Sequence, residues 1–168
     1  MSTRGAWGIK KGDKLIVQYN HFDSYPTGLG EQIVEDLNEW YKDAPEEWIK
    51  RLNEVLDEVE AINEEETPEP TEEQLQYIRD EGIAFNENYK EWYSVLNELQ
   101  GRVLPYLKGF KYFLNAGEDW LKDKLFCEWA YIFNLDNNTL EINGVPYPIK
   151  DLSLDLMRKI EKEAYDER

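Results

Sequence analysis

The sequence has little of the chemistry that metal centres and disulfide-linked proteins require. It holds one cysteine, Cys127, and one histidine, His21, among 168 residues. A single thiol forms neither an internal disulfide nor a thiolate cluster, and one imidazole leaves the common zinc ligand sets incomplete. The scarcity of cysteine and histidine does not exclude a magnesium or calcium site built from carboxylates. We therefore predict no cofactor and no metal, and a protein of the reducing cytoplasm.

Long apolar runs and an excess of positive charge are also missing. No run reaches the roughly 18 apolar residues that span a bilayer, and the N-terminus lacks the apolar centre of a signal peptide. Lysine and arginine number 19 against 36 aspartates and glutamates, a net charge of −17 that disfavours binding to nucleic-acid phosphates. Aromatic residues make up 14% of the chain, however, so the composition predicts a packed core rather than a disordered acidic chain.

The negative charge is concentrated in one stretch of the chain. Residues 31–88 hold 20 acidic and 4 basic side chains, whereas residues 1–30 have a small positive balance. Two interpretations are open for this stretch: the solvated face of helices, or a docking surface for a basic partner. The carboxylates that we expect on a docking surface are Asp57, Glu58, Glu64, Glu65 and Glu66.

Two β-hairpins are predicted from alternating apolar residues. The first combines residues 6–10 and 14–20, and the second combines residues 126–135 and 139–143 around an asparagine-rich turn. Because an isolated hairpin is marginal in water, we expect the two to join in one antiparallel sheet. Helices that cover this sheet would complete a single α+β domain over residues 1–168.

The chain between the hairpins is predicted to be an acidic, mainly helical insertion over residues 31–109. Apolar residues at helical spacing predict its helices, which we place from about residue 31, over 45–62, over 71–82 and over 87–103. Thr71, three residues before Gln74, predicts a capping box, and Ser153 is expected to cap a C-terminal helix.

One loop-like run, residues 19–30, concentrates groups that could form a site. His21 and Asp23 point the same way in an extended chain, so the carboxylate could orient the imidazole. Gly28 and Gly30 precede a helix and could bring backbone N–H groups to an anion. The same run is also typical of a turn that only shapes the chain. The residues that we predict to bind a ligand or partner are Arg4, Lys14, Tyr19, His21, Asp23, Tyr25, Gly28 and Gly30.

Enzyme hypotheses are few, and we favour a binding protein over an enzyme. A catalytic triad would have to use His21, and no nucleophile elbow is present. Ser2, exposed once Met1 is removed, could serve an N-terminal-nucleophile hydrolase, although serine is common at this position. A nucleotide-binding or nucleotide-processing enzyme that uses His21 and Asp23 is the other alternative.

The opening of the chain resembles a group of small uncharacterised proteins from bacteriophages and prophages. The resemblance is carried by Thr3-Arg4-Gly5, by the run YNHFDSYPTGLG at residues 19–30, and by the aromatic strand Glu128-Trp129-Ala130-Tyr131. It implies a setting in the cytoplasm of a bacterial host and supplies no activity. We therefore expect an accessory protein that binds and inhibits a host defence factor. Its partner would be a protein with a basic surface, met by the acidic face, or a small anionic nucleotide, met by the 19–30 run.

Overall fold

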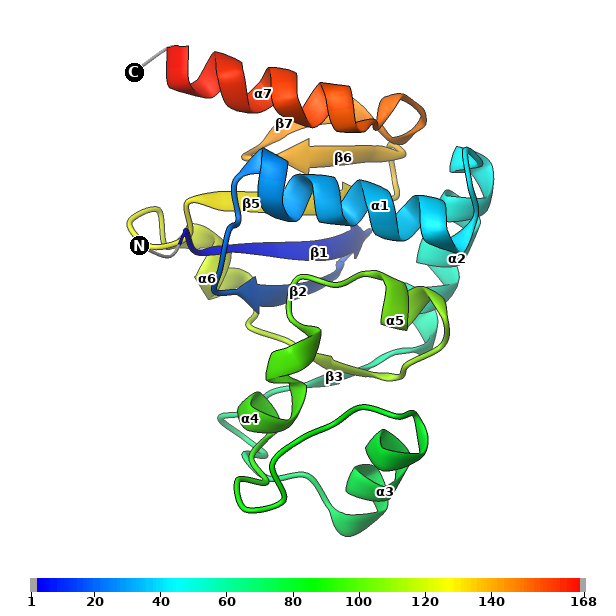
Figure 1. The fold of residues 1–168 in the computed structure, drawn as a ribbon, viewed down its shortest axis with the longest axis vertical. Helices are drawn as coiled ribbons and strands as arrows, with labels where there is room; N and C mark the ends of the chain where they lie inside the picture. The colour runs from blue at the N-terminus through cyan, green and yellow to red at the C-terminus, as the bar shows by residue number, and fades with distance from the viewer. Residues whose placement is uncertain (1–2, 167–168) are drawn as a thin grey trace.

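The computed structural model describes residues 3–166 and is built around a five-stranded sheet with helices on both sides (Figure 1). The predicted α+β class is confirmed. The strands follow the order β2-β1-β5-β6-β7 across the sheet. Their bounds are β1 Gly5–Lys11, β2 Lys14–Asn20, β5 Trp129–Asn134, β6 Thr139–Ile142 and β7 Val145–Pro148.

Both predicted hairpins are present, and they meet through a parallel pairing. β1 lies beside β5 with Gly5 opposite Trp129 and Lys10 opposite Asn134, whereas the other three pairings of the sheet are antiparallel. Strands that run in parallel need a long crossover connection. The helical chain between the hairpins supplies that connection, so the sheet is mixed where we predicted it to be fully antiparallel.

Helices lie on both faces of the sheet and below its β2 edge (Figure 1). α1 and α7 cover one face, α6 lies behind the other, and α3 and α4 lie below the β2 edge near a small parallel sheet of β3 and β4. The helix bounds are α1 Glu31–Trp40, α2 Pro45–Glu58, α3 Glu72–Asp80, α4 Trp92–Leu96, α5 Leu104–Leu107, α6 Glu118–Lys122 and α7 Leu154–Asp166, and the small strands are β3 Glu60–Ile62 and β4 Tyr112–Leu114.

Two of the predicted helices are too long. The second ends at Glu58, and after Val59 the chain continues as β3, which pairs with β4. The fourth begins only at Trp92, after an Asx turn in which the Asn88 amide donates to Asn86 Oδ1 at 2.9 Å. Gly101 ends this region with a φ of 78°, a conformation that a helix cannot continue through.

The predicted helix caps are confirmed. Thr71 Oγ1 accepts from the Gln74 amide at 3.1 Å, and the Gln74 side chain accepts from the Thr71 amide at 2.8 Å. At α7 the Leu156 amide donates to Ser153 Oγ at 3.0 Å. Both caps satisfy backbone donors that the first helical turn leaves open.

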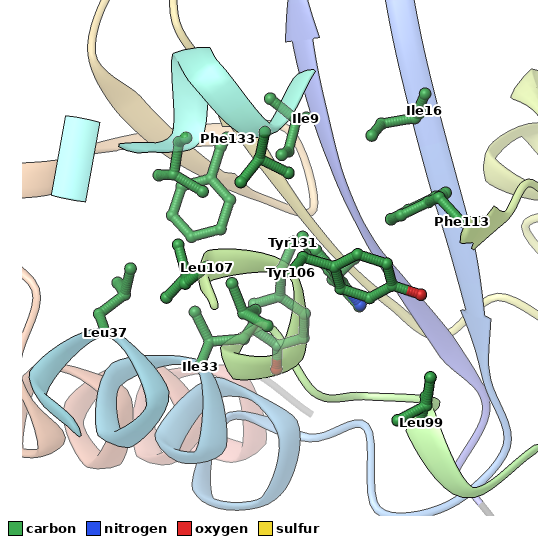
Figure 2. Close-up of a cluster of buried hydrophobic side chains, with 14 of the residues drawn as sticks. Ile9, Ile16, Ile33, Leu37, Leu99, Tyr106, Leu107, Phe113, Tyr131 and Phe133 are labelled. Atoms are coloured by element: carbon green, nitrogen blue, oxygen red, sulfur yellow. The ribbon is translucent and has the colours of Figure 1, made fainter. Parts of the chain in front are cut away.

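One apolar core joins the hairpins to the helical insertion. Trp7 of β1, Leu52 of α2, Ile78 of α3 and Phe133 of β5 belong to the same buried cluster. Figure 2 shows its centre, where side chains from the sheet and from α1 meet those of α5 and β4; the labelled residues are Ile9, Ile16, Ile33, Leu37, Leu99, Tyr106, Leu107, Phe113, Tyr131 and Phe133. The insertion therefore contributes buried side chains to the same core as the sheet.

A buried hydrogen-bond chain runs through this core. Trp7 Nε1 donates to Gln18 Oε1 and Gln18 Nε2 donates to Tyr106 Oη, each at 3.1 Å, and Tyr106 Oη donates to the Tyr112 carbonyl at 3.0 Å. Burial raises the pKa of the Tyr106 hydroxyl, so it remains a donor at neutral pH. Polar groups that are buried and fully paired fix one arrangement of the core.

The buried carboxylate of Asp36 ties α1 to the start of α5 and forms an ion pair with the partly exposed Arg102. It is fully buried, and its carboxylate accepts from Arg102 Nη2 at 2.9 Å and from Arg102 Nε at 3.1 Å. The amides of Val103 and Leu104 also donate to Asp36 Oδ2, at 2.9 and 3.2 Å. One member of the acidic stretch is thus a structural residue of the core.

A smaller apolar cluster lies on the opposite face of the sheet, under α6. Its buried members are Ala6, Val17, Ile132 and Cys127. Burial raises the pKa of the Cys127 thiol to about 11, two units above the usual value of 9.0 for a thiol, and only 8% of the residue is exposed. Because the thiolate is the reactive form, the raised pKa and the low exposure both slow the reaction of Cys127 with electrophiles and oxidants.

We predict that Cys127 of the folded protein reacts with iodoacetamide at pH 8 at least about 100-fold more slowly than a free cysteine, because two pKa units remove about 99% of its thiolate. The rate is followed by intact mass, with the urea-unfolded protein as control. A folded-state rate equal to that of the unfolded chain would contradict the burial.

Within residues 3–166, no helix combines the length and the apolar character needed to cross a bilayer.

Candidate functional site

A cleft of about 510 Å³ opens beside the outer edge of β2. Its size suits a ligand or an inserted side chain. Five segments that are distant in the sequence form it: β2, the turn after β3, the α4 region, the end of β4, and α6 with the residue that follows it. Its lining residues are Gln18, Tyr19, Glu64, Tyr93, Leu96, Asn97, Gln100, Leu114, Asn115, Ala116, Asp119, Trp120 and Asp123. We call it the Tyr19 cleft.

Aromatic rings form one wall of the Tyr19 cleft. The rings of Tyr19 and Trp120 meet edge to face with centroids 5.0 Å apart, and Trp120 Nε1 is held by the Gly5 carbonyl at 2.9 Å. Tyr93, 42% exposed, contributes a third ring. Aromatic faces held in place in this way can stack against a planar or cationic group.

His21 lies next to this wall and pairs with Tyr19. Tyr19 Oη lies 2.5 Å from His21 Nδ1, and the rings of His21 and Phe22 meet edge to face at 4.5 Å. Burial raises the pKa of the Tyr19 hydroxyl, an effect that the charge of Arg4 partly offsets, so Tyr19 is a hydrogen-bond donor at neutral pH. A neutral imidazole then accepts at Nδ1 and carries its hydrogen on Nε2.

The amide side chains of the cleft are anchored by bonds inside the protein. Gln100 Oε1 accepts from the His21 amide at 2.7 Å, and Gln100 Nε2 donates to Asn97 Oδ1 at 2.6 Å. Asn115 Oδ1 accepts from the amides of Val17 and Gly117, at 2.9 and 3.1 Å. Within residues 3–166, the side-chain nitrogens of Asn97 and Asn115 form no hydrogen bond, so each can donate to a ligand.

Carboxylates set the charge of the cleft. Glu64, Asp119 and Asp123 line it, and none of the lining residues in the described chain is lysine or arginine. Burial raises the pKa of Glu64, and the neighbouring charges of Glu65 and Glu91 raise it further. A cation would relieve this unfavourable concentration of negative charge.

The structure separates the predicted residues of the 19–30 run into two groups. Tyr19 and His21 lie at the cleft, whereas Asp23 and Tyr25 turn away from it. The imidazole pairs with Tyr19, and the Asp23 carboxylate instead pairs with the Tyr25 hydroxyl, whose pKa it raises. The predicted His21–Asp23 pair is therefore not formed, because Asp23 adopts a φ of 51° that breaks the extended chain.

The glycines of the run shape the chain rather than offer donors to an anion. The Gly28 amide donates to the Tyr25 carbonyl at 2.8 Å, and a Cβ on Gly30 would lie 2.7 Å from Met157 Sδ. Glu161 of α7 already occupies the start of this helical turn, accepting from Thr27 Oγ1 at 2.9 Å. The predicted role of Gly28 and Gly30 as an anion cradle does not fit these contacts.

The predicted cations do not converge on a site. Arg4 precedes β1 and places its guanidinium over the Phe126 ring, 5.6 Å from the centroid. Lys14 begins β2 at the other end of the hairpin and pairs with Asp57 at 3.2 Å. The two therefore form no common pocket for an anionic ligand.

A second hollow, of about 550 Å³, lies on the α6 face of the sheet. Its lining mixes lysines with carboxylates, and Lys10 pairs with Glu141 at 2.8 Å, while Lys122 pairs with Glu118 at 3.4 Å. Lys14 pairs with Asp57 as well, so three of the four lysines in this lining are already paired, and paired cations offer little to an anion.

The five residues of the predicted acidic docking face also lie in different places in the structure. Asp57 and Glu58 form ion pairs at the end of α2, the first with Lys14 and the second with Arg51 at 3.1 Å. Glu64 lines the Tyr19 cleft, while Glu65 and Glu66 lie exposed in the turn that follows β3. Only Glu64 of these five residues joins the cleft.

Ser2, the residue of the N-terminal-nucleophile hypothesis, lies outside the described residues.

Residues 3–166 contain no group of three or more histidine, cysteine, aspartate or glutamate side chains placed to hold a metal ion. Comparison of the chain with protein families, with curated proteins and with solved structures finds no match. The functional argument therefore rests on the geometry and charge of the cleft.

Sequence reasoning found Tyr19, His21 and Glu64 but missed most of the cleft. Tyr93, Asn97, Gln100, Asn115 and Trp120 come from segments whose only common feature is their position in the fold. The one signal in the sequence was the aromatic and amide content of residues 92–120, and nothing there indicates convergence on β2.

Proposed function

We propose that the protein binds a basic segment of a partner protein in the Tyr19 cleft. One observation carries the proposal: three carboxylates and three aromatic rings line a single cleft whose described lining holds no basic side chain. Interface cores are enriched in aromatic residues, and charge complementarity steers a basic partner to an acidic site. A nucleotide phosphate would meet like charge in this cleft.

The kind of partner follows from the resemblance to bacteriophage and prophage proteins. We propose a host factor of the bacterial cytoplasm, and inhibition of that factor by occlusion of its basic segment. The acidic surface outside the cleft supports this assignment, because its charge raises the rate of encounter with a basic protein.

The cleft offers a matched pair of variants to test the proposal. The double substitution Glu64→Gln with Asp119→Asn removes two charges from the lining. The control, Glu65→Gln with Glu118→Gln, removes two charges from the neighbouring positions outside it. Because both variants change the net charge equally, long-range steering falls by a similar amount in each.

We expect wild-type protein and the control to capture the same partner from bacterial lysate, and the cleft variant to bind that purified partner about tenfold more weakly. The loss of two ion pairs of about 0.5–1 kcal/mol each gives this factor. Added salt screens such pairs and should therefore reduce the difference in affinity between wild type and the cleft variant. Affinities are measured by calorimetry. Equal affinity of the two variants would place binding outside the cleft, and a nucleotide as the only captured molecule would contradict a protein partner.

A further inference from the structure

The outer edge of β2 carries an unpaired backbone position at the Tyr19 cleft. β2 is the edge strand of the five-stranded sheet and faces the region of α4 and β3 (Figure 1). In an antiparallel strand the N–H and C=O of one residue point to the same side, and the side alternates along the chain. The partners of Val17 and His21 therefore determine where the N–H and C=O of Tyr19 point.

The N–H and C=O of Val17 and the N–H of His21 point away from β1, and all three form hydrogen bonds within the protein. The Val17 amide donates to Asn115 Oδ1 at 2.9 Å, and the Val17 carbonyl accepts from the Ala116 amide at 2.7 Å. The His21 amide donates to Gln100 Oε1 at 2.7 Å. Tyr19 lies two residues from each, so its N–H and C=O point the same way, away from β1.

No residue of the described chain pairs with these two groups of Tyr19. Asn115 and Ala116 cover the strand edge on one side of Tyr19, and Gln100 covers it on the other. An open edge that a protein leaves between two closed stretches is a place where another chain can add a strand.

We propose that the partner's basic segment binds in extended form and adds to β2 as a short strand, with one arginine exchanging both backbone hydrogen bonds with Tyr19. This inference rests on the proposed function and specifies how the segment is held. Residues directly opposite in a sheet place their side chains on the same face. The arginine side chain therefore lies beside the Tyr19 ring, on the face that holds Trp120.

The surroundings of that position suit a guanidinium group. The rings of Tyr19 and Trp120 provide faces on which its plane can stack, and Asp119 of α6 and Asp123, which follows α6, provide carboxylate acceptors in the same lining. The free side-chain nitrogens of Asn97 and Asn115 can donate to carbonyls of the added segment. Lysine, which lacks the planar group, should bind more weakly at this position.

The test uses a seven-residue peptide, acetylated and amidated, with arginine at its centre and a valine on either side. Binding is followed by NMR, together with hydrogen exchange of individual amides. In the free protein we expect the Tyr19 amide to exchange faster than the Val17 amide, which is bonded to Asn115. Saturation with peptide should slow exchange at Tyr19.

Methylation of the peptide's backbone nitrogens supplies the matched control. N-methylation of the arginine removes the donor that faces Tyr19 and should weaken binding about tenfold. N-methylation of a valine removes a donor that points away and should leave binding within about twofold.

Each other outcome has a defined meaning. Slow exchange at Tyr19 in the free protein, or peptide binding that leaves this amide unprotected, overturns strand addition and leaves the proposed function standing. The same holds if the peptide fails to bind at millimolar concentration while capture of a partner still depends on Glu64 and Asp119. Failure of both experiments overturns both proposals.

Discussion

Replacement of Asp36 by alanine is expected to lower the free energy of unfolding by about 2–4 kcal/mol, because the buried amides of Val103 and Leu104 lose their acceptor, whereas Arg102 is 40% exposed and can turn to water. The carboxylate of Asp36 is fully buried and receives four hydrogen bonds within 3.2 Å when the Arg102 and backbone donors are taken together. Its loss would leave the Arg102 guanidinium and the amides of Val103 and Leu104 without their acceptor. Unfolding in urea, followed by tryptophan fluorescence, measures the effect.

Glu35→Ala is the matched control, since Glu35 is the preceding residue of α1 and is exposed. We expect that variant to stay within about 0.5 kcal/mol of wild type, as is usual for surface substitutions. Asp36→Asn keeps the shape of the side chain and loses its charge, so it should fall between the two. If Asp36→Ala and Glu35→Ala were equally stable, the ion pair would contribute nothing to the core.

Replacement of Gly28 by alanine is the second large effect, about 3 kcal/mol of lost stability. A Cβ at this position would lie 2.0 Å from the Asp23 carbonyl oxygen, and a backbone atom cannot move aside as the end of a side chain can. The displacement would also break the bond from the Leu29 amide to the same oxygen, 2.8 Å in length. Thermal unfolding by calorimetry measures the loss.

Gly82→Ala separates collision from backbone strain. Gly82 has a φ of 77°, which disfavours alanine, but no atom lies within 4 Å of the added Cβ. We expect a cost of about 1 kcal/mol there, from the left-handed conformation alone. A Gly28→Ala variant no less stable than Gly82→Ala would show that residues 23–28 can shift freely, contrary to the tight turn described above.

The parts of the fold that the sequence predicts well depend on local chemistry. Alternating residues predicted both hairpins, and Thr71 with Gln74 predicted the capping box, because the groups that interact lie within a few residues of one another. The α+β class followed from the order of these elements. Each of these features can form before the rest of the chain is placed.

The errors lie where distant segments decide the local structure. Val59 and Ile62 continue the apolar spacing of α2, so the spacing alone predicts a helix that includes them, yet Ile62 pairs with Leu114 in the small sheet. A partner 52 positions away overrides a local preference that is worth a few tenths of a kcal/mol per residue. The parallel pairing of β1 and β5 escaped prediction for the same reason.

The candidate site shows the same limit. The 19–30 run stood out because unusual residues are adjacent there, but several of them serve the turn itself. Ser24 is fully buried, and its carbonyl accepts from Tyr131 Oη at 2.7 Å. What makes Tyr19 a candidate for binding is the open strand edge and the approach of Trp120, and neither follows from the neighbours of Tyr19 in the sequence.

The parallel pairing between β1 and β5 also determines when this protein can fold as it is made. During synthesis Gly5 emerges 124 residues before its partner Trp129. Until then the first hairpin is an isolated pair of strands with an unsatisfied edge, which is marginal in water. The central pairing of the sheet therefore forms only after β5 has been synthesised, and a chain that stops before β5 cannot form it.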